Sequence, residues 1–194
     1  QWDLRRITSW GQEVTVTGLV RGDIYHSNNN LLTPTPSYRG EGGWQARGIA
    51  IAAVDIAWPF IGGFAGGTQI LTPRLQLVAA PEINNLDIPN EDSRAIDLED
   101  SNLFALNRFP GYDRVEDGVR MTYGLDWQAN FPGWRISTNI GQSYRLTSKP
   151  TLLPEGTGLS DRSSDIVGRT EVQYRNFIKL THRFRVDTGN ATFR

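Results

Sequence analysis

The residue types that carry catalytic or metal chemistry are scarce in this chain. Cysteine is absent and only two histidines occur, His26 and His182, which excludes a thiolate nucleophile and disfavours a zinc site. Either histidine could serve a Ser-His-Asp hydrolase, but the sequence contains no G-x-S-x-G nucleophile elbow. We therefore predict that the chain is not an enzyme and has no catalytic residues.

Two other motifs resemble ligand sites but lack the spacing that such sites need. Asp97, Glu99 and Asp100 could bind a hard divalent cation, yet no matching loop pattern surrounds them, and a solvated acidic loop is the favoured interpretation. Residues 62–67 are glycine-rich without the G-x-G-x-x-G spacing, and we interpret them as a flexible turn. No metal and no cofactor are predicted.

Composition narrows the class of protein. The 194 residues carry 20 Lys and Arg against 21 Asp and Glu, for a formal net charge of −1, so no nucleic-acid partner is predicted. No run of about 18 apolar residues occurs, and no transmembrane helix is expected. The 6 Trp, 6 Tyr, 8 Phe and 20 Gly are typical of β-structure. Two classes remain, a soluble all-β domain and part of a membrane β-barrel.

Alternation of apolar and polar residues is the strongest structural signal. Over residues 119–131 every odd position is apolar and no even position is. Side chains alternate across a β-strand, so this segment has one apolar and one polar face. The alternation resumes over residues 134–145 after Pro132-Gly133, which predicts a long hairpin closed by a Pro-Gly turn.

Other segments show the same period of two. These further predicted strands span residues 2–8, 13–24, 44–58, 71–77, 166–175 and 178–187. In the segment 44–58 the polar face is interrupted by Ile49, Ile51 and Ala53.

Strand and connection lengths favour the membrane class. Soluble strands average about five or six residues, whereas a tilted membrane strand needs about nine to eleven, and most segments here support ten or more. Short connections are predicted at residues 9–12, 59–66, 132–133 and 175–177, and long polar loops at 27–43, 81–118 and 147–163. Their strict alternation, with aromatic residues beside the short connections, is typical of an outer-membrane barrel.

We therefore predict an all-β fold, an antiparallel up-and-down transmembrane β-barrel of the outer membrane. Residues 1–194 would form part of a single barrel domain. Eight strands are predicted and residues 191–194 begin a ninth, so the chain is expected to supply about eight to nine strands of a larger barrel. A soluble β-sandwich could hold the same charges on its outer face and remains the structural alternative.

Charged side chains on the polar strand faces are then expected to line a water-filled lumen. The predicted lumen-facing residues are Arg120, Asp126, Arg135, Arg169, Glu171, Lys179 and Arg183. Basic groups suit phosphate, but Asp126 and Glu171 weaken the case for a dedicated phosphate site among them.

The loop over residues 81–118 mixes bulky apolar residues with Asn, Arg and Asp. Loops of this length are usually functional or folded onto the scaffold, and we predict that this one folds inward over the pore. Its candidate residues are Asn90, Asp92, Ser93, Asn102, Leu103, Phe104, Asn107, Arg108, Phe109, Gly111, Tyr112, Asp113 and Arg114. Both a packed loop without a ligand and a loop that contacts a substrate are compatible with the sequence.

Specific contacts are predicted within this loop. Phe104, Leu106 and Phe109 are expected to pack against the scaffold. The cations Arg108 and Arg114 are expected to pair with one of two carboxylates, which belong to Asp92 and Asp113.

The same loop carries a family resemblance. Residues 88–93 (IPNEDS) and 102–114 (NLFALNRFPGYDR), followed by Tyr123-Gly124-Leu125, are similar to the C-terminal barrel domain of the LPS-assembly outer-membrane protein family (LptD, also called OstA). Residues 58–60 (WPF) and 164–169 (SDIVGR) also resemble that family. The likeness runs from about residue 12 to the end of the chain.

The resemblance implies a lipopolysaccharide translocon in the outer membrane of a Gram-negative cell. In that family a lipoprotein plugs a large barrel, a periplasmic jelly-roll domain delivers lipopolysaccharide, and the lipid leaves between the first and last strands without covalent chemistry. The implied partners are lipopolysaccharide, a plug lipoprotein and outer-membrane lipid. This chain lacks the jelly-roll, the seam strands and the family's frequent cysteines, so we expect a middle portion of the barrel wall. A general porin or diffusion channel is the alternative.

Overall fold

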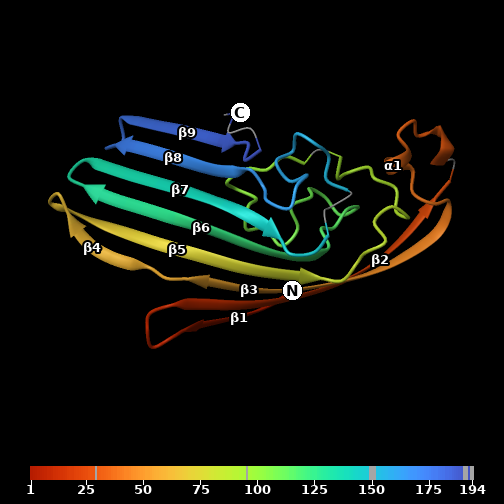
Figure 1. Ribbon diagram of the computed structural model, residues 1–194, viewed down its shortest axis with the longest axis horizontal. Helices are drawn as coiled ribbons and strands as arrows, with labels where there is room; N and C mark the ends of the chain where they lie inside the picture. Colours follow the sequence, from red (N-terminus) through yellow and green to blue (C-terminus); the bar gives the residue numbers. More distant parts are fainter. Residues whose placement is uncertain (29, 95, 149–151, 190–191, 193–194) are drawn as a thin grey trace.

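The chain folds into one antiparallel β-sheet with almost no helix (Figure 1). The computed structural model describes residues 1–28, 30–94, 96–148, 152–189 and 192. The strands are β1 (Trp2–Ile7), β2 (Glu13–Ser27), β3 (Gly43–Ala57), β4 (Phe60–Phe64), β5 (Gly67–Ala80), β6 (Gly118–Phe131), β7 (Trp134–Arg145), β8 (Ile166–Tyr174) and β9 (Ile178–Val186). Their order is β1-β2-β3-β5-β6-β7-β8-β9, with β4 paired to β5 outside this path.

This arrangement confirms the predicted all-β antiparallel fold. The sheet is open, because β1 pairs only with β2 and β9 only with β8 among the described residues. The beginning of a further strand predicted over residues 191–194 lies outside the described residues, apart from Thr192.

Strands β3 and β4 are two parts of one bent strand. Ala57 and Phe60 both pair with β5 in a single continuous register. Between them lies Pro59, which has no N–H to donate to the ladder. The predicted turn over residues 59–66 is therefore wrong. The chain continues as a strand and turns only at residues 65–66, where both residues have the positive φ that a tight hairpin requires.

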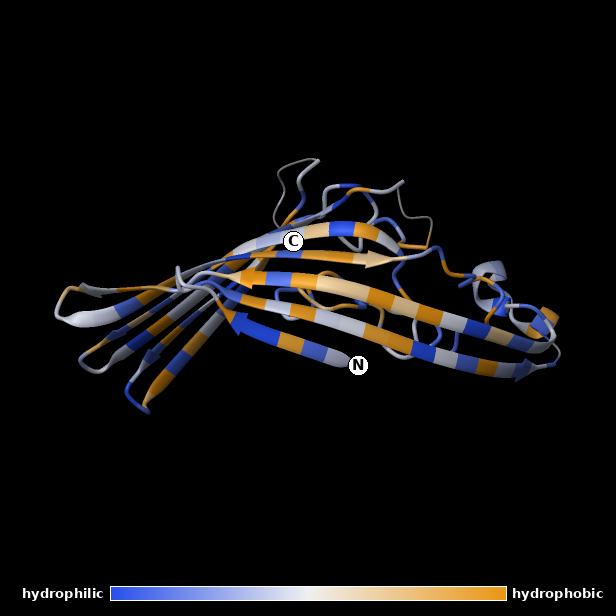
Figure 2. Ribbon diagram, turned by 90° about the horizontal axis from the view of Figure 1, so that it is seen from below, coloured by the Kyte–Doolittle hydropathy of each residue, from blue (hydrophilic) through white to orange (hydrophobic). Residues whose placement is uncertain are grey.

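The two faces of the sheet have different polarity. Hydropathy alternates along the strands (Figure 2), because successive side chains point to opposite sides. One side, here called the bare face, exposes apolar residues such as Val20, Ile24 and Leu180. The other side, here called the covered face, carries the polar residues and supports the long loops.

Short and long connections lie at opposite ends of the sheet (Figure 1). The short ones join β1 to β2, β4 to β5, β6 to β7 and β8 to β9. The long ones are the first loop (residues 28–42), the central loop (residues 81–117) and the distal loop (residues 146–165). The first loop contains a 3-10 turn, η1 (Asn30–Leu32), and a single helical turn, α1 (Pro36–Arg39). Within the described part of the chain, no helix has the length and hydropathy needed to cross a bilayer.

The hydrophobic core lies between the covered face and the loops. One buried cluster joins the central loop to β3 and β5; its members are Ile49, Ile51, Ala53, Val78, Ala80, Ile83 and Val115. A second joins the central loop, the distal loop and β8; its members are Leu98, Leu103, Phe109, Leu153, Leu159 and Val167. The three apolar residues that interrupt the polar pattern of β3 thus face a loop rather than water.

Candidate functional site

The central loop uses asparagine side chains in place of regular backbone pairing. It has no helix or strand over its described residues, so its backbone groups need other partners. The Asn85 side chain accepts the Val115 N–H at 2.9 Å and donates to the Val115 carbonyl at 2.8 Å. The Asn107 side chain accepts the Glu116 N–H and donates to the Arg114 carbonyl, both at 3.0 Å. Each amide replaces one step of a strand ladder and gives the loop a defined shape.

Two carboxylates close the tip of the loop by capping each other's backbone. Asp92 accepts the N–H of Asp113 at 3.0 Å and that of Tyr112 at 2.7 Å. Asp113 accepts the N–H of Asp92 at 3.1 Å and that of Glu91 at 2.7 Å. Burial raises the pKa of Asp92, but the backbone N–H groups of Tyr112 and Asp113 outweigh it and hold that pKa below its ordinary value.

Gly111 is required at this tip. Its φ is 71°, in the left-handed region that favours glycine. A Cβ at this position would also lie 2.2 Å from Cγ of Asp92. The backbone turn and the carboxylate cap therefore depend on the same glycine.

The predicted partners of Arg108 and Arg114 are wrong. Nε of Arg108 donates to the Glu116 carboxylate at 2.7 Å. Arg114 donates to three backbone carbonyls, those of Ile88 at 2.8 Å, Ser37 at 2.9 Å and Asp113 at 3.2 Å, and to neither predicted carboxylate. The physical reason is that both oxygens of Asp92 and Oδ2 of Asp113 accept backbone N–H groups, which a loop without regular structure must satisfy.

Glu116 is the charged centre beneath the central loop. Three guanidiniums surround its carboxylate: Arg108 from the loop, Arg120 from β6 and Arg145 from β7, the last two at 3.5 Å. The side chains of Glu116 and Arg120 are only 2% and 1% exposed. Burial raises the pKa of Glu116, but the three cations outweigh it and bring the pKa to about 2. This Glu116 cluster therefore stays ionised and ties the loop to two strands.

A second contact holds the middle of the loop through its aromatic residue. The guanidinium carbon of Arg74 lies 4.1 Å from the ring centroid of Phe104, within the range of a cation–π interaction. Asp55 fixes Arg74 in place through hydrogen bonds of 2.7 to 3.0 Å. The Gln76 side chain donates to the Phe104 carbonyl at 3.0 Å.

Two glycines in the sheet make room for the loop. A Cβ on Gly141 would lie 2.6 Å from Cδ2 of Leu103, and one on Gly124 would lie 3.2 Å from the Phe104 ring. Both glycines therefore let apolar loop side chains reach the backbone of β6 and β7.

The other predicted loop residues also take part in local contacts. Asn90 accepts the Ser93 N–H at 3.0 Å, and the Ser93 hydroxyl donates to the Pro110 carbonyl. The Asn102 side chain donates to the Asp97 carbonyl at 2.7 Å. Phe109 is buried in the second hydrophobic cluster.

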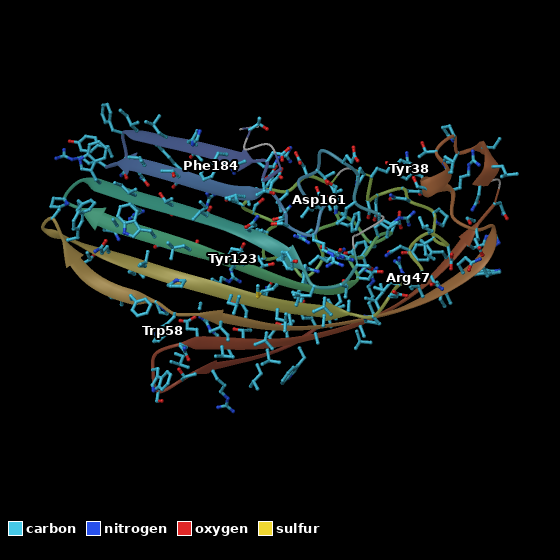
Figure 3. The ribbon with its side chains drawn as sticks, in the orientation of Figure 1. Tyr38, Arg47, Trp58, Tyr123, Asp161 and Phe184 are labelled. Atoms are coloured by element: carbon cyan, nitrogen blue, oxygen red, sulfur yellow. The ribbon has the colours of Figure 1, made fainter. Side chains whose placement is uncertain are left out.

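The loop tip also reaches the hairpin of β2 and β3. The Tyr112 carbonyl accepts hydrogen bonds from Arg21 and Arg47, each at 2.7 Å. Arg47, labelled in Figure 3, lies among the loop side chains, and Asp23 pairs with it at 2.8 Å.

The predicted lumen-facing residues lie on the covered face in different surroundings. Arg120 is covered by the central loop and donates to the Ala105 and Leu106 carbonyls. Arg169 and Arg183 pair with Asp100 of the loop at 3.3 and 3.4 Å.

The remaining candidates lie nearer the short turns. Lys179 pairs with Glu171 at 3.0 Å. Asp126 is half-buried on β6. Arg135 donates to the Asn130 side chain at 3.3 Å.

Several important residues were missed by sequence reasoning. Sequence reasoning did not single out Glu116, Arg145, Asn85 or Arg47. Arg145, Asn85 and Arg47 each have main contacts with residues at least 24 positions away. Glu116 also pairs with the nearer Arg108 and Arg120, but that pairing depends on the folded loop. The acidic pair Glu116-Asp117 directly before a predicted strand was the one local clue.

Both histidines lie beside aromatic rings. The His26 ring lies 4.7 Å from Trp44 and the His182 ring 6.1 Å from Phe184, measured between ring centroids. Among the described residues, no group of three or more His, Asp or Glu side chains could hold a metal ion.

Comparison with known proteins identifies the family of this chain. The family described as "LPS transport system D" matches residues 1–194. The chain belongs to the LptD family. Curated LptD relatives include the LPS-assembly protein LptD of Thiobacillus denitrificans, 28% identical over 127 residues, which are 64% of this chain and 17% of that protein.

Two further relatives carry the same name. The LPS-assembly protein LptD of Methylococcus capsulatus is 31% identical over 63% of this chain and 13% of its own length. That of Hahella chejuensis is 36% identical over 49% of this chain and 12% of its own length. The chain thus spans less than a fifth of the LptD relatives that it matches.

Proposed function

We propose that this chain forms a section of the barrel wall of an outer-membrane lipopolysaccharide translocon. Its role would be structural and conductive rather than enzymatic: it helps insert lipopolysaccharide into the outer leaflet without a covalent step. The observation that carries the proposal is the pairing of an apolar bare face with a polar face covered by a packed loop, in a chain of the LptD family.

The bare face suits contact with outer-membrane lipid. Strands β2, β3, β5 and β6 have 14 or 15 residues, more than the nine to eleven that a tilted membrane strand requires. Trp58 and Phe60 lie close to the short-turn end of the sheet, with ring centroids 5.0 Å apart, as expected of an interfacial aromatic girdle. Residues 1–194 would then be part of one barrel domain in the outer membrane of a Gram-negative cell.

The covered face suits a lumen that is partly closed by the central loop. Toward the long-loop end, the two hydrophobic clusters and the Glu116 cluster fill the space above the sheet. Toward the short turns, the polar side chains of Arg135, Glu171 and Lys179 remain accessible to water. This open half would face either lipopolysaccharide or a plug lipoprotein inside the barrel.

The test is purification of the full-length protein from outer membranes in mild detergent. We expect bound lipopolysaccharide and a lipoprotein in equal molar amount, and no nucleic acid. A folded protein that carries neither would contradict the translocon. Conductance in planar bilayers then separates the alternative, because a general diffusion porin would give large open-channel currents without a plug.

A further inference from the structure

The cleft between two neighbouring short turns has a charge that nothing in the described structure neutralises. It lies where the β6–β7 turn meets the β8–β9 turn and has a volume of about 340 Å³. Its lining residues include Arg135, Arg175, Asn130, Gln173 and Asn176. Two guanidiniums and three side-chain amides thus face one cleft, and no carboxylate lines it.

Arg135 is exceptional among the cations of the covered face. Arg21, Arg47, Arg74, Arg120, Arg145, Arg169, Lys179, Arg183 and Arg185 each have a carboxylate partner within 4.0 Å. Within the described strands, Arg135 has none, and its Nε donates only to the Asn130 side chain at 3.3 Å. The rest of its guanidinium fork is available to a ligand.

The second cation is held in place by its backbone. Arg175 has a φ of 48°, which is uncommon for a residue with a side chain. Its N–H donates to the Gly133 carbonyl at 2.7 Å and its carbonyl accepts the Gln173 side chain at 2.9 Å. The first bond ties the β8–β9 turn to the β6–β7 turn, and the second holds the backbone of Arg175 within its own turn, so both arginines line one cleft. Backbone strain of this kind is commonly retained at binding sites.

Two aromatic residues, Phe131 and Trp134, also line the cleft. Behind them, the Tyr174 ring lies 4.6 Å from the Trp134 ring between centroids, and the Arg175 guanidinium carbon lies 5.5 Å from the Tyr174 centroid. Aromatic residues of this kind occupy the level of lipid headgroups in membrane proteins. Paired guanidinium forks match the geometry of phosphate oxygens, which accept bidentate hydrogen bonds.

We propose that this cleft binds the phosphate of a lipid headgroup at the short-turn rim of the sheet. The inference deepens the proposed function and rests on it, since it places the short turns at a membrane surface and Arg135, on the covered face, at the lumen side of that rim. A glycerophospholipid and lipopolysaccharide both carry such a phosphate. Arg135 and Arg175 bind its oxygens, while the amides of Asn130 and Asn176 are the additional donors.

The experiment uses the full-length protein in maltoside detergent and counts bound lipid by native mass spectrometry. The probes are phosphatidylglycerol, diacylglycerol as its phosphate-free counterpart, and lipopolysaccharide with and without its phosphates. The test variant is Arg135→Gln/Arg175→Gln. The control is Arg6→Gln, an exposed arginine on β1 at the same end of the sheet but outside the cleft.

We expect the double variant to bind the phosphate-bearing probe at least about tenfold more weakly than the wild type and the control, because charge-assisted hydrogen bonds are lost. Binding of phosphatidylglycerol identifies a glycerophospholipid site, and binding of lipopolysaccharide alone identifies the other source. Equal binding by all three proteins overturns the inference, as does a wild type that does not distinguish phosphatidylglycerol from diacylglycerol.

A second measurement does not depend on folding of the double variant. A photoreactive p-benzoylphenylalanine at position 176, with both arginines intact, is expected to cross-link phosphate-bearing lipid. A cross-link only to polypeptide would overturn the inference in favour of an acidic protein partner. A wild-type protein purified without the lipoprotein or without bound lipopolysaccharide would instead contradict the proposed function. Failure of the phosphate site and failure of the proposed function therefore give different results.

Discussion

The carboxylates of Asp92 and Asp113 cap each other's backbone across 21 residues of chain, each accepting two main-chain N–H groups. This reciprocal cap draws the two arms of the central loop together where the loop has no regular secondary structure. It also accounts for the arginines, which bind other groups while both carboxylates cap backbone N–H groups. The cap is the first feature to test.

Replacing Asp113 with Ala should loosen the loop tip. The N–H groups of Glu91 and Asp92 would lose their acceptor, at a cost of about 1–3 kcal/mol for each group left without a partner. Hydrogen exchange of the full-length protein should increase over residues 88–93 and 110–114. The matched control is Glu155→Ala, an exposed acidic residue of the distal loop. Unchanged exchange in Asp113→Ala would show that water replaces the cap without loss.

The Glu116 cluster should be the main electrostatic anchor of the loop. In Glu116→Gln the three arginines lose their shared carboxylate, and removal of one partner from a buried ion pair typically costs about 3–5 kcal/mol. We expect faster hydrogen exchange throughout the central loop and increased entry of large antibiotics into cells. Glu82→Gln, an exposed acid in the same loop, should leave both unchanged. Equal behaviour of the two variants would mean that apolar packing alone holds the loop.

The Glu116 cluster should weaken over a defined range of acidic pH. The pKa of Glu116 falls from an ordinary 4.5 to about 2 on folding. A pKa that is lower in the folded state stabilises the fold fully above pH 4.5, and this stabilisation is lost as the pH falls toward 2. At about 1.4 kcal/mol per unit of pKa difference, it amounts to about 3 kcal/mol. Loop protection measured between pH 6 and pH 2 should therefore decline below about 4.5. The decline should be smaller in Glu116→Gln, and an identical decline would assign it to other carboxylates.

The β-architecture was predictable because its signal is local. Alternation over residues 119–131 and 134–145 follows directly from the two-residue repeat of a strand, and β6 and β7 occupy those residues with small differences at their ends. The break at Pro59 was overestimated because proline removes one donor but does not prevent the strand from continuing. The partners of Arg108 and Glu116 depend on the folded path of the loop, which no local pattern encodes. The prediction paired Arg108 and Arg114 with Asp92 or Asp113 because opposite charges lie near each other in the sequence. In the structure, those two carboxylates accept backbone N–H groups instead.

The last prediction concerns the close packing of loop and sheet at Gly141. A Cβ there would meet Cδ2 of Leu103 at 2.6 Å and the Tyr123 carbonyl oxygen at 2.8 Å. Because Gly141→Ala forces the loop away from β7, we expect a loss of about 1–3 kcal/mol, the usual cost of overpacking. The control is Gly48→Ala, where the added Cβ meets nothing within 4 Å. The unfolding temperatures of both variants can be measured on the full-length protein in detergent, by the change in gel migration that heating causes.

Combining Gly141→Ala with Leu103→Ala separates the two contacts that the added Cβ would make. If the clash with Leu103 dominates, the unfolding temperature of the double variant should fall by less than the sum of the falls in the two single variants. Strict additivity would place the strain in the Tyr123 carbonyl contact, which belongs to the sheet and not to the loop. The position of the loop over the covered face would then not depend on Gly141. It would depend on the Glu116 cluster and on the contact of Phe104 with Arg74.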